Sequence, residues 1–353
     1  MIIKKTIQRI LLGMCILLPM QLSSAAQVSN NYYNMLLDDV SANKYRHGVD
    51  KATDVYQFFK ATNTFNDVLV YPDFAGFSNL ILPDTTKEHL NYPLNMLSKI
   101  MTLHRNVKTV NTLESLEYLA KECKKGKQVF YSYYTDEEVK KDPSLQNTGL
   151  FFFRGKRNAP YAIVVPGGYK YRTILHEGFP IAIPISRRGY NVFVLSYRIG
   201  EVSKGSEDLV KAIKYIQKNS TRLGVKADQY SLWGASVGAQ VIINVSHKAL
   251  KDDKILQNLP SSNILTYPLS FFPTKKEIPT FIVIGDQDKI VNSTILKSSI
   301  VNLKKNGIEA DYLEMPRLGH GFGLGINQDS SVGVNWISRA VSFWSDVSDF
   351  SED

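Results

Sequence analysis

The chain has 353 residues, of which 44% are hydrophobic and 21% charged, and its formal net charge is +9. These values are typical of a globular protein long enough for one large α/β domain with an appended segment. No internal repeat or low-complexity tract is visible. The basic residues are scattered among acidic ones, without the basic blocks and interleaved aromatics of nucleic-acid grooves, so we expect no nucleic-acid partner.

The first 26 residues have the pattern of a secretory signal peptide. Three basic residues precede the apolar run Ile10–Met20, and Ser24–Ala26 fits the small-x-small rule for cleavage before Gln27. Cys15 follows Met14 rather than a small residue, so lipidation is not expected. Losing this segment lowers the formal charge from +9 to +6. We therefore predict a secreted or periplasmic protein without stable membrane insertion after cleavage. An uncleaved N-terminal anchor is the alternative, although the apolar run is short for a membrane span.

Cys123 is the single cysteine that remains after such a cleavage. A disulfide within the mature monomer is therefore excluded, and the core has to provide the stability. No group of Cys and His residues has the spacing of metal ligands, so neither a metal nor another cofactor is expected. We interpret Cys123 as a small hydrophobic residue on a helix.

Residues 27–146 are predicted to form an N-terminal extension. Helices are expected over Met96–Leu103 and Leu113–Cys123, and a strand over Gln128–Tyr134. The turn-rich aromatic stretch Tyr71–Phe77 favours a place in the core over a ligand-binding role. No charge run or Pro/Ser linker separates this segment from the rest of the chain. We therefore expect it to pack on the next domain and to contribute residues that line the active site.

Strands and helices alternate through residues 147–353, the predicted catalytic domain. Apolar strands are predicted at Leu150–Phe153, Tyr161–Val165, Asn191–Leu195, Gln229–Trp233, Asn263–Tyr267, Thr280–Ile284 and Ala310–Glu314. Helices are predicted at Glu207–Lys218, Ala239–Ala249, Ser293–Lys305 and Val332–Val347. The turn-like residues 155–160 predict that the first two strands form a hairpin. The alternation favours an α/β fold with a mostly parallel sheet covered by helices on both faces.

The segment Gly234-Ala235-Ser236-Val237-Gly238 matches the nucleophile elbow G-x-S-x-G. In this motif the serine sits on a sharp, strained turn between a strand and a helix, and small neighbours tolerate the crowding. A predicted strand precedes the segment and a helix-like run comes after it, which is the context that the motif requires. We predict Ser236 to be a nucleophile, with a glycine-rich structural turn as the alternative.

A serine hydroxyl is a poor nucleophile at neutral pH and needs a histidine as base. In hydrolases with this elbow the chain order is serine, acid, histidine, and only His247 and His320 follow Ser236. His247 lies eleven residues after the serine, on a helix that runs away from it, which favours a surface position. His320 lies in the glycine-rich loop Leu318–Gly323 and is the predicted base.

The acid that orients this histidine is expected between the two, on a loop that follows a strand. The carboxylates in that interval are Asp252, Asp253, Glu277, Asp286, Asp288, Glu309, Asp311 and Glu314. Only Asp286 and Asp288 come directly after a clear buried strand. We favour Asp288, because the Asp286 side chain is better placed to hydrogen-bond the backbone of its own turn.

An oxyanion hole needs two backbone N–H donors. Val237, the residue after the serine, is the first candidate. The second is expected from Pro166-Gly167-Gly168-Tyr169, which follows the strand Tyr161–Val165. Glycines let this loop approach a substrate carbonyl closely, and an ordinary glycine turn is the alternative.

Four motifs together resemble one group of proteins. They are Pro166-Gly167-Gly168-Tyr169, Gly234-Ala235-Ser236-Val237-Gly238, Gly285-Asp286-Gln287-Asp288 and Gly319-His320-Gly321-Phe322-Gly323. Over roughly Thr148–Trp344 the chain is similar to the acetyl-esterase/lipase-like branch of the α/β-hydrolases, which contains acetylxylan esterases and related secreted esterases. The resemblance implies an eight-stranded, mostly parallel sheet and hydrolysis of short acyl esters, often acetyl groups on carbohydrate. It also implies Ser236, Asp288 and His320 as nucleophile, acid and base.

The oxyanion loop departs from that pattern. Many relatives carry three glycines there, whereas this chain has Gly167 and Gly168 followed by Tyr169. Either the tyrosine replaces the third glycine and narrows the acyl pocket, or the loop is one residue shorter. Gly168 and Tyr169 both remain candidates for the second donor.

Two other functions are compatible with the same fold. A serine peptidase of the prolyl-oligopeptidase kind shares this catalytic core, but residues 27–146 are too few and too helical for its β-propeller. A catalytically silent binding protein would fit the altered glycine loop, but the complete set of serine, acid and histidine argues against it. We predict a small-molecule or carbohydrate ester as substrate, and the sequence predicts no oligomeric state.

Overall fold

The computed structural model describes residues 56–83, 86–102, 104, 106–169, 171–325 and 336–348. The predicted signal peptide, its cleavage site and the start of the predicted extension lie outside these residues.

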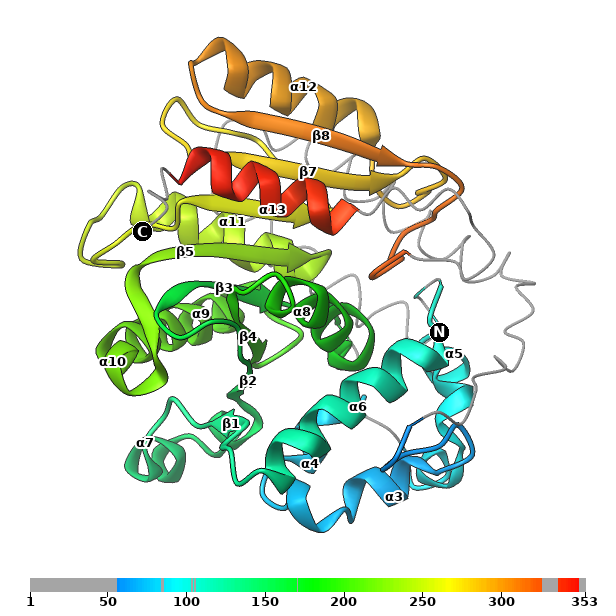
Figure 1. The fold of residues 1–353 in the computed structure, drawn as a ribbon. Coiled ribbons are helices and arrows are strands. Elements are labelled where there is room, and N and C mark those ends of the chain that lie inside the picture. The colour runs from blue at the N-terminus through cyan, green and yellow to red at the C-terminus, as the bar shows by residue number, and fades with distance from the viewer. Residues whose placement is uncertain are drawn as a thin grey trace.

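An eight-stranded sheet forms the centre of the molecule (Figure 1), in the order β1-β2-β4-β3-β5-β6-β7-β8. Its strands are β1 Phe130–Tyr131, β2 Gly149–Phe153, β3 Ala159–Val165, β4 Asn191–Ser196, β5 Val225–Ala235, β6 Ser262–Thr266, β7 Thr280–Gly285 and β8 Ala310–Met315. β2 is antiparallel to β1 and β4, and the neighbours from β4 to β8 are parallel. This arrangement confirms the predicted α/β-hydrolase fold with its mostly parallel sheet.

Helices cover the sheet on both faces: α8 and α13 lie on one face, and α9 and α11 lie on the other (Figure 1). The α-helices are α3 Phe65–Leu69, α4 Ser78–Ile81, α5 Leu97–Ile100, α6 Thr109–Lys124, α7 Asp136–Lys141, α8 Phe179–Ser186, α9 Val202–Lys218, α10 Ser220–Leu223, α11 Val237–Ala249, α12 Ser293–Lys305 and α13 Trp336–Val347. Short turns of other helix types are η1 Pro72–Phe74, η2 His89–Asn91, η3 Leu94–Met96, η4 Pro143–Asn147 and η5 Ile174–Gly178.

The sequence explains why the central strands lie inside. Every residue of β4 and β7 is buried, and most of them are apolar, as expected for strands that are covered by helices on both faces. The helix α9 instead has one apolar face, on which Leu209, Ile213 and Ile216 are fully buried. This spacing of three and four residues is that of a helix that packs on one side only.

The predicted hairpin between the first two strands is wrong. β2 and β3 do not pair, because β4 lies between them, antiparallel to β2 and parallel to β3. The buried strand β4 needs a neighbouring strand along each of its edges. The loop that follows β2 therefore only passes the end of β4 before β3 begins. There the side chain of Asn191 accepts a hydrogen bond from the Gly155 N–H and donates one to the Lys156 carbonyl. Length and composition of the loop could not distinguish this crossing from a hairpin.

Other elements differ from the prediction in extent. The strand expected over Gln128–Tyr134 is reduced to the two residues of β1, and the helix expected from Met96 ends at Ile100. The helix α8 was not predicted: Pro184 in its interior disfavours a helix, whereas Pro180 lies in the first turn, where proline is tolerated. Burial compensates for this, since seven of its eight residues are buried against the sheet and α6.

The segment before residue 147 packs directly on the sheet. β1 pairs with β2, so this segment supplies the edge strand. Phe74 and Phe77 are buried, as predicted, and the Phe77 ring lies 5.4 Å from Phe130 and 5.6 Å from Phe151. Aromatic pairs at such distances add to the stability that burial provides.

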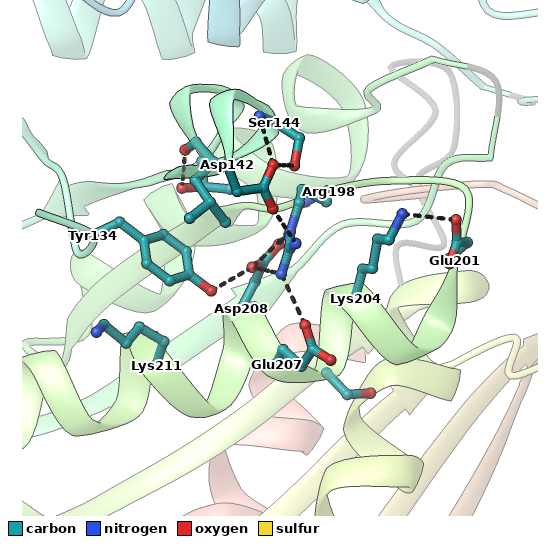
Figure 2. A network of polar contacts seen from close by, with 12 residues as sticks. Tyr134, Asp142, Ser144, Arg198, Glu201, Lys204, Glu207, Asp208 and Lys211 are labelled. Atoms are coloured by element: carbon teal, nitrogen blue, oxygen red, sulfur yellow. Dashed lines mark hydrogen bonds and ion pairs between the residues drawn. The ribbon is translucent and has the colours of Figure 1, made fainter. Parts of the chain in front are cut away.

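A buried ion pair also connects this segment to the sheet (Figure 2). The Asp208 side chain is fully buried and accepts hydrogen bonds from the Arg198 backbone N–H at 2.8 Å, from its guanidinium, and from the Tyr134 hydroxyl at 2.7 Å. Arg198 also reaches Asp142 at 3.3 Å and the exposed Glu207 at 3.1 Å. Tyr134 and Asp142 both precede residue 147, so this network joins the two parts of the chain.

Replacing Arg198 with alanine is expected to lower the free energy of unfolding by about 3–5 kcal/mol, because Asp208 is then left buried without its counter-charge. Urea unfolding followed by circular dichroism measures the change. Glu207→Gln is the matched control, since Glu207 touches the same arginine but lies 67% exposed. This control is expected to cost less than about 1 kcal/mol. Equal losses in the two variants would contradict this account.

Across the described residues, no helix combines the length and the apolar character that a membrane crossing requires.

Candidate active site

Five neighbouring parallel strands, β3, β5, β6, β7 and β8, end at the same edge of the sheet. The glycine loop follows β3, Ser236 follows β5, Tyr267 follows β6, Asp288 follows β7, and His320 follows β8. Because the carboxyl ends of parallel strands meet at one edge, residues far apart in the sequence converge there.

The turn around Ser236 has the strained geometry that the elbow motif predicts. Ser236 has φ +49° and ψ −115°, a conformation that residues other than glycine seldom adopt, and its N–H donates to the Thr266 carbonyl at 3.0 Å. A Cβ atom at Gly238 would lie 2.1 Å from the Val165 carbonyl oxygen, so no larger residue fits there. The predicted helix after the serine is present, and α11 begins at Val237, two residues before the expected start at Ala239.

The structure brings the three predicted side chains together in one chain of hydrogen bonds. The Ser236 hydroxyl lies 3.0 Å from His320 Nε2, and His320 Nδ1 lies 2.9 Å from Asp288 Oδ2. The Asp288 side chain is fully buried and that of His320 is 9% exposed. A carboxylate facing Nδ1 favours the tautomer that carries its proton there, which leaves Nε2 free to accept the serine proton.

Asp286 and Asp288 differ sharply in environment. Asp286 is exposed, whereas Asp288 Oδ1 accepts hydrogen bonds from the Ile290 and Val291 N–H groups, both at 2.9 Å. The prediction that Asp286 caps this turn is wrong. Asp288 caps it, and its second oxygen remains available for His320.

His247 is not simply a surface residue, which corrects that part of the sequence interpretation. Its Nε2 lies 2.8 Å from the buried carboxylate of Glu277, and its side chain is 23% exposed. Counting along α11, the residue lies roughly 16 Å from Ser236. Of the other carboxylates, Asp311 pairs with Arg339 and Glu314 with Lys297. None of these groups contacts His320.

The glycine loop lies directly over the serine. A Cβ atom on Gly167 would lie 3.2 Å from the Ser236 Cβ, and one on Gly168 would lie 2.4 Å from the Tyr171 carbonyl oxygen. Gly168 also has φ +113°, which side-chain-bearing residues rarely adopt. The Gly167 N–H is occupied, since it donates to Glu177 Oε2 at 3.0 Å. Val237 is the first residue of α11, so its N–H has no acceptor within the helix.

Sequence reasoning missed a second polar cluster behind this loop, formed by His104, Glu177 and Tyr267. The Tyr267 hydroxyl donates to Glu177 Oε1 at 2.6 Å, and His104 Nε2 lies 3.4 Å from the same oxygen. Tyr267 has φ +39°, and its ring centroid lies 4.9 Å from that of His320. The one available signal was Glu177 itself, an acidic residue just before the apolar run that starts at Phe179.

Glu177 is fully buried, yet its charged form is favoured. Burial raises the pKa of its carboxyl, but the nearby His104 and His176 and the hydrogen bond from Tyr267 outweigh this, and the pKa lies well below its usual range. Burial, together with the negative charge of Glu177, holds the pKa of the Tyr267 hydroxyl well above its usual value. The tyrosine therefore keeps its proton, and its hydroxyl donates a hydrogen bond to the carboxylate.

No protein-family model matches the chain. Over 119 residues, 30% of this chain, it is 29% identical to endo-1,4-beta-xylanase B of Butyrivibrio fibrisolvens. The chain spans only 19% of the length of that relative.

Several solved structures are similar to this one. One is MGS-M1, an α/β-hydrolase from a Medee basin deep-sea metagenome library, with 21% identity, a TM-score of 0.48, and coverage of 57% of this chain and 93% of that one. Another is esterase 2 of Thermogutta terrifontis, with 16% identity, a TM-score of 0.49, and coverage of 62% and 91%. A third is an acetyl ester-xyloside bifunctional hydrolase from Caldicellulosiruptor lactoaceticus, with 19% identity, a TM-score of 0.49, and coverage of 62% and 96%. These similarities assign neither a family nor a reaction to the chain.

Proposed function

We propose that this protein is a serine hydrolase that cleaves carboxylic esters through a covalent acyl-enzyme. The observation that carries the proposal is the continuous hydrogen-bonded chain from Ser236 through His320 to the buried Asp288, at 3.0 and 2.9 Å. A nucleophile, a base within reach of it and a group that orients the base are the parts that this chemistry needs.

In the proposed reaction, His320 Nε2 takes the proton of the Ser236 hydroxyl as its oxygen attacks the ester carbonyl carbon. The negative charge that develops on the carbonyl oxygen is held by the Val237 N–H and by a second N–H, from Gly168 or Tyr169. His320 then gives its proton to the departing alcohol. Water, activated by the same histidine, attacks the acyl-enzyme and releases the acid. Asp288 stabilises the imidazolium in both halves of the cycle.

We propose short acyl esters as substrates, acetyl groups on carbohydrate among them. The support is the resemblance of the four sequence motifs to acetyl esterases, together with the place of Tyr169. This tyrosine is half-buried, and if it replaces the third glycine of many relatives, it narrows the space for an acyl chain. The partial likeness to a xylanase is compatible with a carbohydrate substrate. With the predicted signal peptide, we propose that the enzyme acts in the periplasm or outside the cell.

Fluorophosphonate labelling tests the proposed chemistry. The reagent is expected to modify the wild type at close to one site per chain, located by mass spectrometry at Ser236, and to leave Ser236→Ala unlabelled. Hydrolysis of p-nitrophenyl acetate is expected to exceed that of the octanoate, and a Pro-containing peptide anilide is expected to remain intact. If the folded wild type is not labelled, the proposal that the protein is a serine hydrolase is refuted. Preferential cleavage of the anilide would identify a peptidase instead.

A further inference from the structure

Glu177 occupies a position between two loops of the proposed site. Its Oε2 accepts a hydrogen bond from Gly167, at the start of the glycine loop, and its Oε1 accepts one from Tyr267. The Tyr267 hydroxyl in turn accepts a hydrogen bond from the Gly323 N–H at 3.1 Å, three residues after His320. One carboxylate therefore connects the oxyanion loop to the loop that carries the proposed base.

Two further contacts hold the same pair of loops. His176, the neighbour of Glu177, places its Nε2 2.8 Å from the Gly321 carbonyl oxygen. Thr173 donates a hydrogen bond to the Gly167 carbonyl at 2.9 Å. Both sides of the Gly167 residue, its N–H and its C=O, are thus fixed from the turn that carries Glu177.

One partner of the Glu177 carboxylate comes from the N-terminal segment. His104 is 7% exposed, lies 3.4 Å from Glu177 Oε1 through its Nε2, and lies 3.0 Å from the Tyr171 hydroxyl through its Nδ1. It also packs on the histidine loop, because a Cβ atom at Gly321 would lie 3.0 Å from the His104 ring. A segment outside the minimal hydrolase fold therefore contributes a side chain to the interior of the site.

A fully buried carboxylate is costly unless it is paired and hydrogen-bonded, and Glu177 is satisfied by groups that all adjoin the proposed site. An apolar side chain could fill the same space without this cost. It could not hold the N–H of Gly167 away from the substrate, nor fix the distance between the two loops. The arrangement favours a role in catalysis over a role in packing.

We propose that Glu177 is a positioning residue that holds the oxyanion loop and the His320 loop in register, and that His104 supports it by contacting its carboxylate. This inference rests on the proposed function. Neither residue touches the substrate. Their effect is on the distance between the second oxyanion donor and the tetrahedral centre, which matters in the transition state more than in the bound substrate.

Glu177→Gln is the central test. A glutamine has one acceptor oxygen in place of two, so it keeps only one of the links to Gly167 and Tyr267. We expect kcat for p-nitrophenyl acetate to fall about 10- to 100-fold, less than the loss of a whole pre-organised site, with KM within about 3-fold of the wild type. The affinity for phenylboronic acid, which forms a tetrahedral adduct with the serine, is expected to fall by a similar factor. Rates are expressed per serine titrated to completion with fluorophosphonate, which removes any loss of folded protein.

Glu277→Gln is the matched control, because it makes the same change in another buried glutamate that is paired with a histidine, away from the site. It is expected to leave kcat within about 2-fold. Tyr267→Phe removes only the hydroxyl that joins Glu177 to Gly323. If Glu177→Gln does not fold, this variant tests whether the link between the two loops supports catalysis. The inference is overturned if kcat per titrated serine and boronate affinity stay within about 2-fold in the folded variants, or if the control loses as much. A wild type that does not label would refute the proposed function instead.

The role of His104 is tested by a double-mutant cycle. His104→Ala is expected to lower kcat, and the double variant His104→Ala/Glu177→Gln is expected to fall no further than Glu177→Gln alone. Losses that multiply would show that His104 acts independently of Glu177 and would overturn its role as the supporting partner of this carboxylate.

Discussion

Replacing His320 with alanine is expected to lower kcat for p-nitrophenyl acetate by about a million-fold, a loss of the size seen when the serine or histidine of a triad is removed. The alanine cannot take the Ser236 proton, and no other base among the described residues lies at the 3.0 Å that separates His320 Nε2 from the serine oxygen. Labelling by fluorophosphonate is expected to slow in parallel, because the serine remains present but is not activated. A stopped assay with high enzyme concentration measures the residual rate.

His247→Ala is the control for this experiment. It removes the only other histidine that follows Ser236, on the helix that the serine begins, and it leaves the buried Glu277 without its partner. We expect a less stable protein with kcat within about 2-fold of the wild type, since the side chain lies about three helical turns from the serine. A comparable loss of kcat in both variants would contradict the assignment of His320 as the base.

Asp288→Asn is expected to lower kcat by about 10⁴-fold while KM changes little. The amide can point its NH₂ group at His320 Nδ1, which favours the tautomer that carries its proton on Nε2 and therefore cannot accept the serine proton. It also no longer stabilises the imidazolium that forms in the transition state. Steady-state kinetics from about pH 6 to 9, the range around an ordinary histidine pKa, measure the loss.

The neighbouring Asp286→Asn makes the same chemical change two residues away in the same turn. Asp286 is exposed and Asp288 holds the hydrogen bond to His320, so this variant is expected to keep kcat within about 2-fold. If the larger loss followed Asp286 instead, the assignment of the acid would be reversed.

Residues whose place is dictated by local backbone geometry could be predicted from the sequence. Ser236 lies in a five-residue pattern that requires a strand before it and a helix after it, and both are present. Asp288 follows a buried strand, as the acid is expected to, but the turn-capping role that was expected of Asp286 belongs to Asp288. Parallel strands brought these residues to one edge, as an alternation of strands and helices predicts.

Features that depend on tertiary pairing could not be predicted. The position of β4 between β2 and β3 is set by which apolar strands share edges, and the short loop after β2 suits a hairpin equally well. The helix α8 forms in spite of Pro184 in its interior because burial outweighs propensity. His104 and Glu177 are 73 positions apart, and no spacing rule joins a histidine in one segment to a glutamate in another.

The two-residue strand β1 has a consequence for anyone who wishes to trim this protein. A fragment that starts at residue 147 keeps every residue of the proposed chemistry but lacks the chain that pairs with β2. The outer backbone groups of Leu150–Phe152 would then lose their partners, beside the Phe151 ring that Phe77 and Phe130 now cover. An open, flat, apolar sheet edge invites pairing between molecules. A piece cut down to the domain that carries Ser236, Asp288 and His320 is therefore expected to self-associate, and soluble production favours keeping the preceding segment attached.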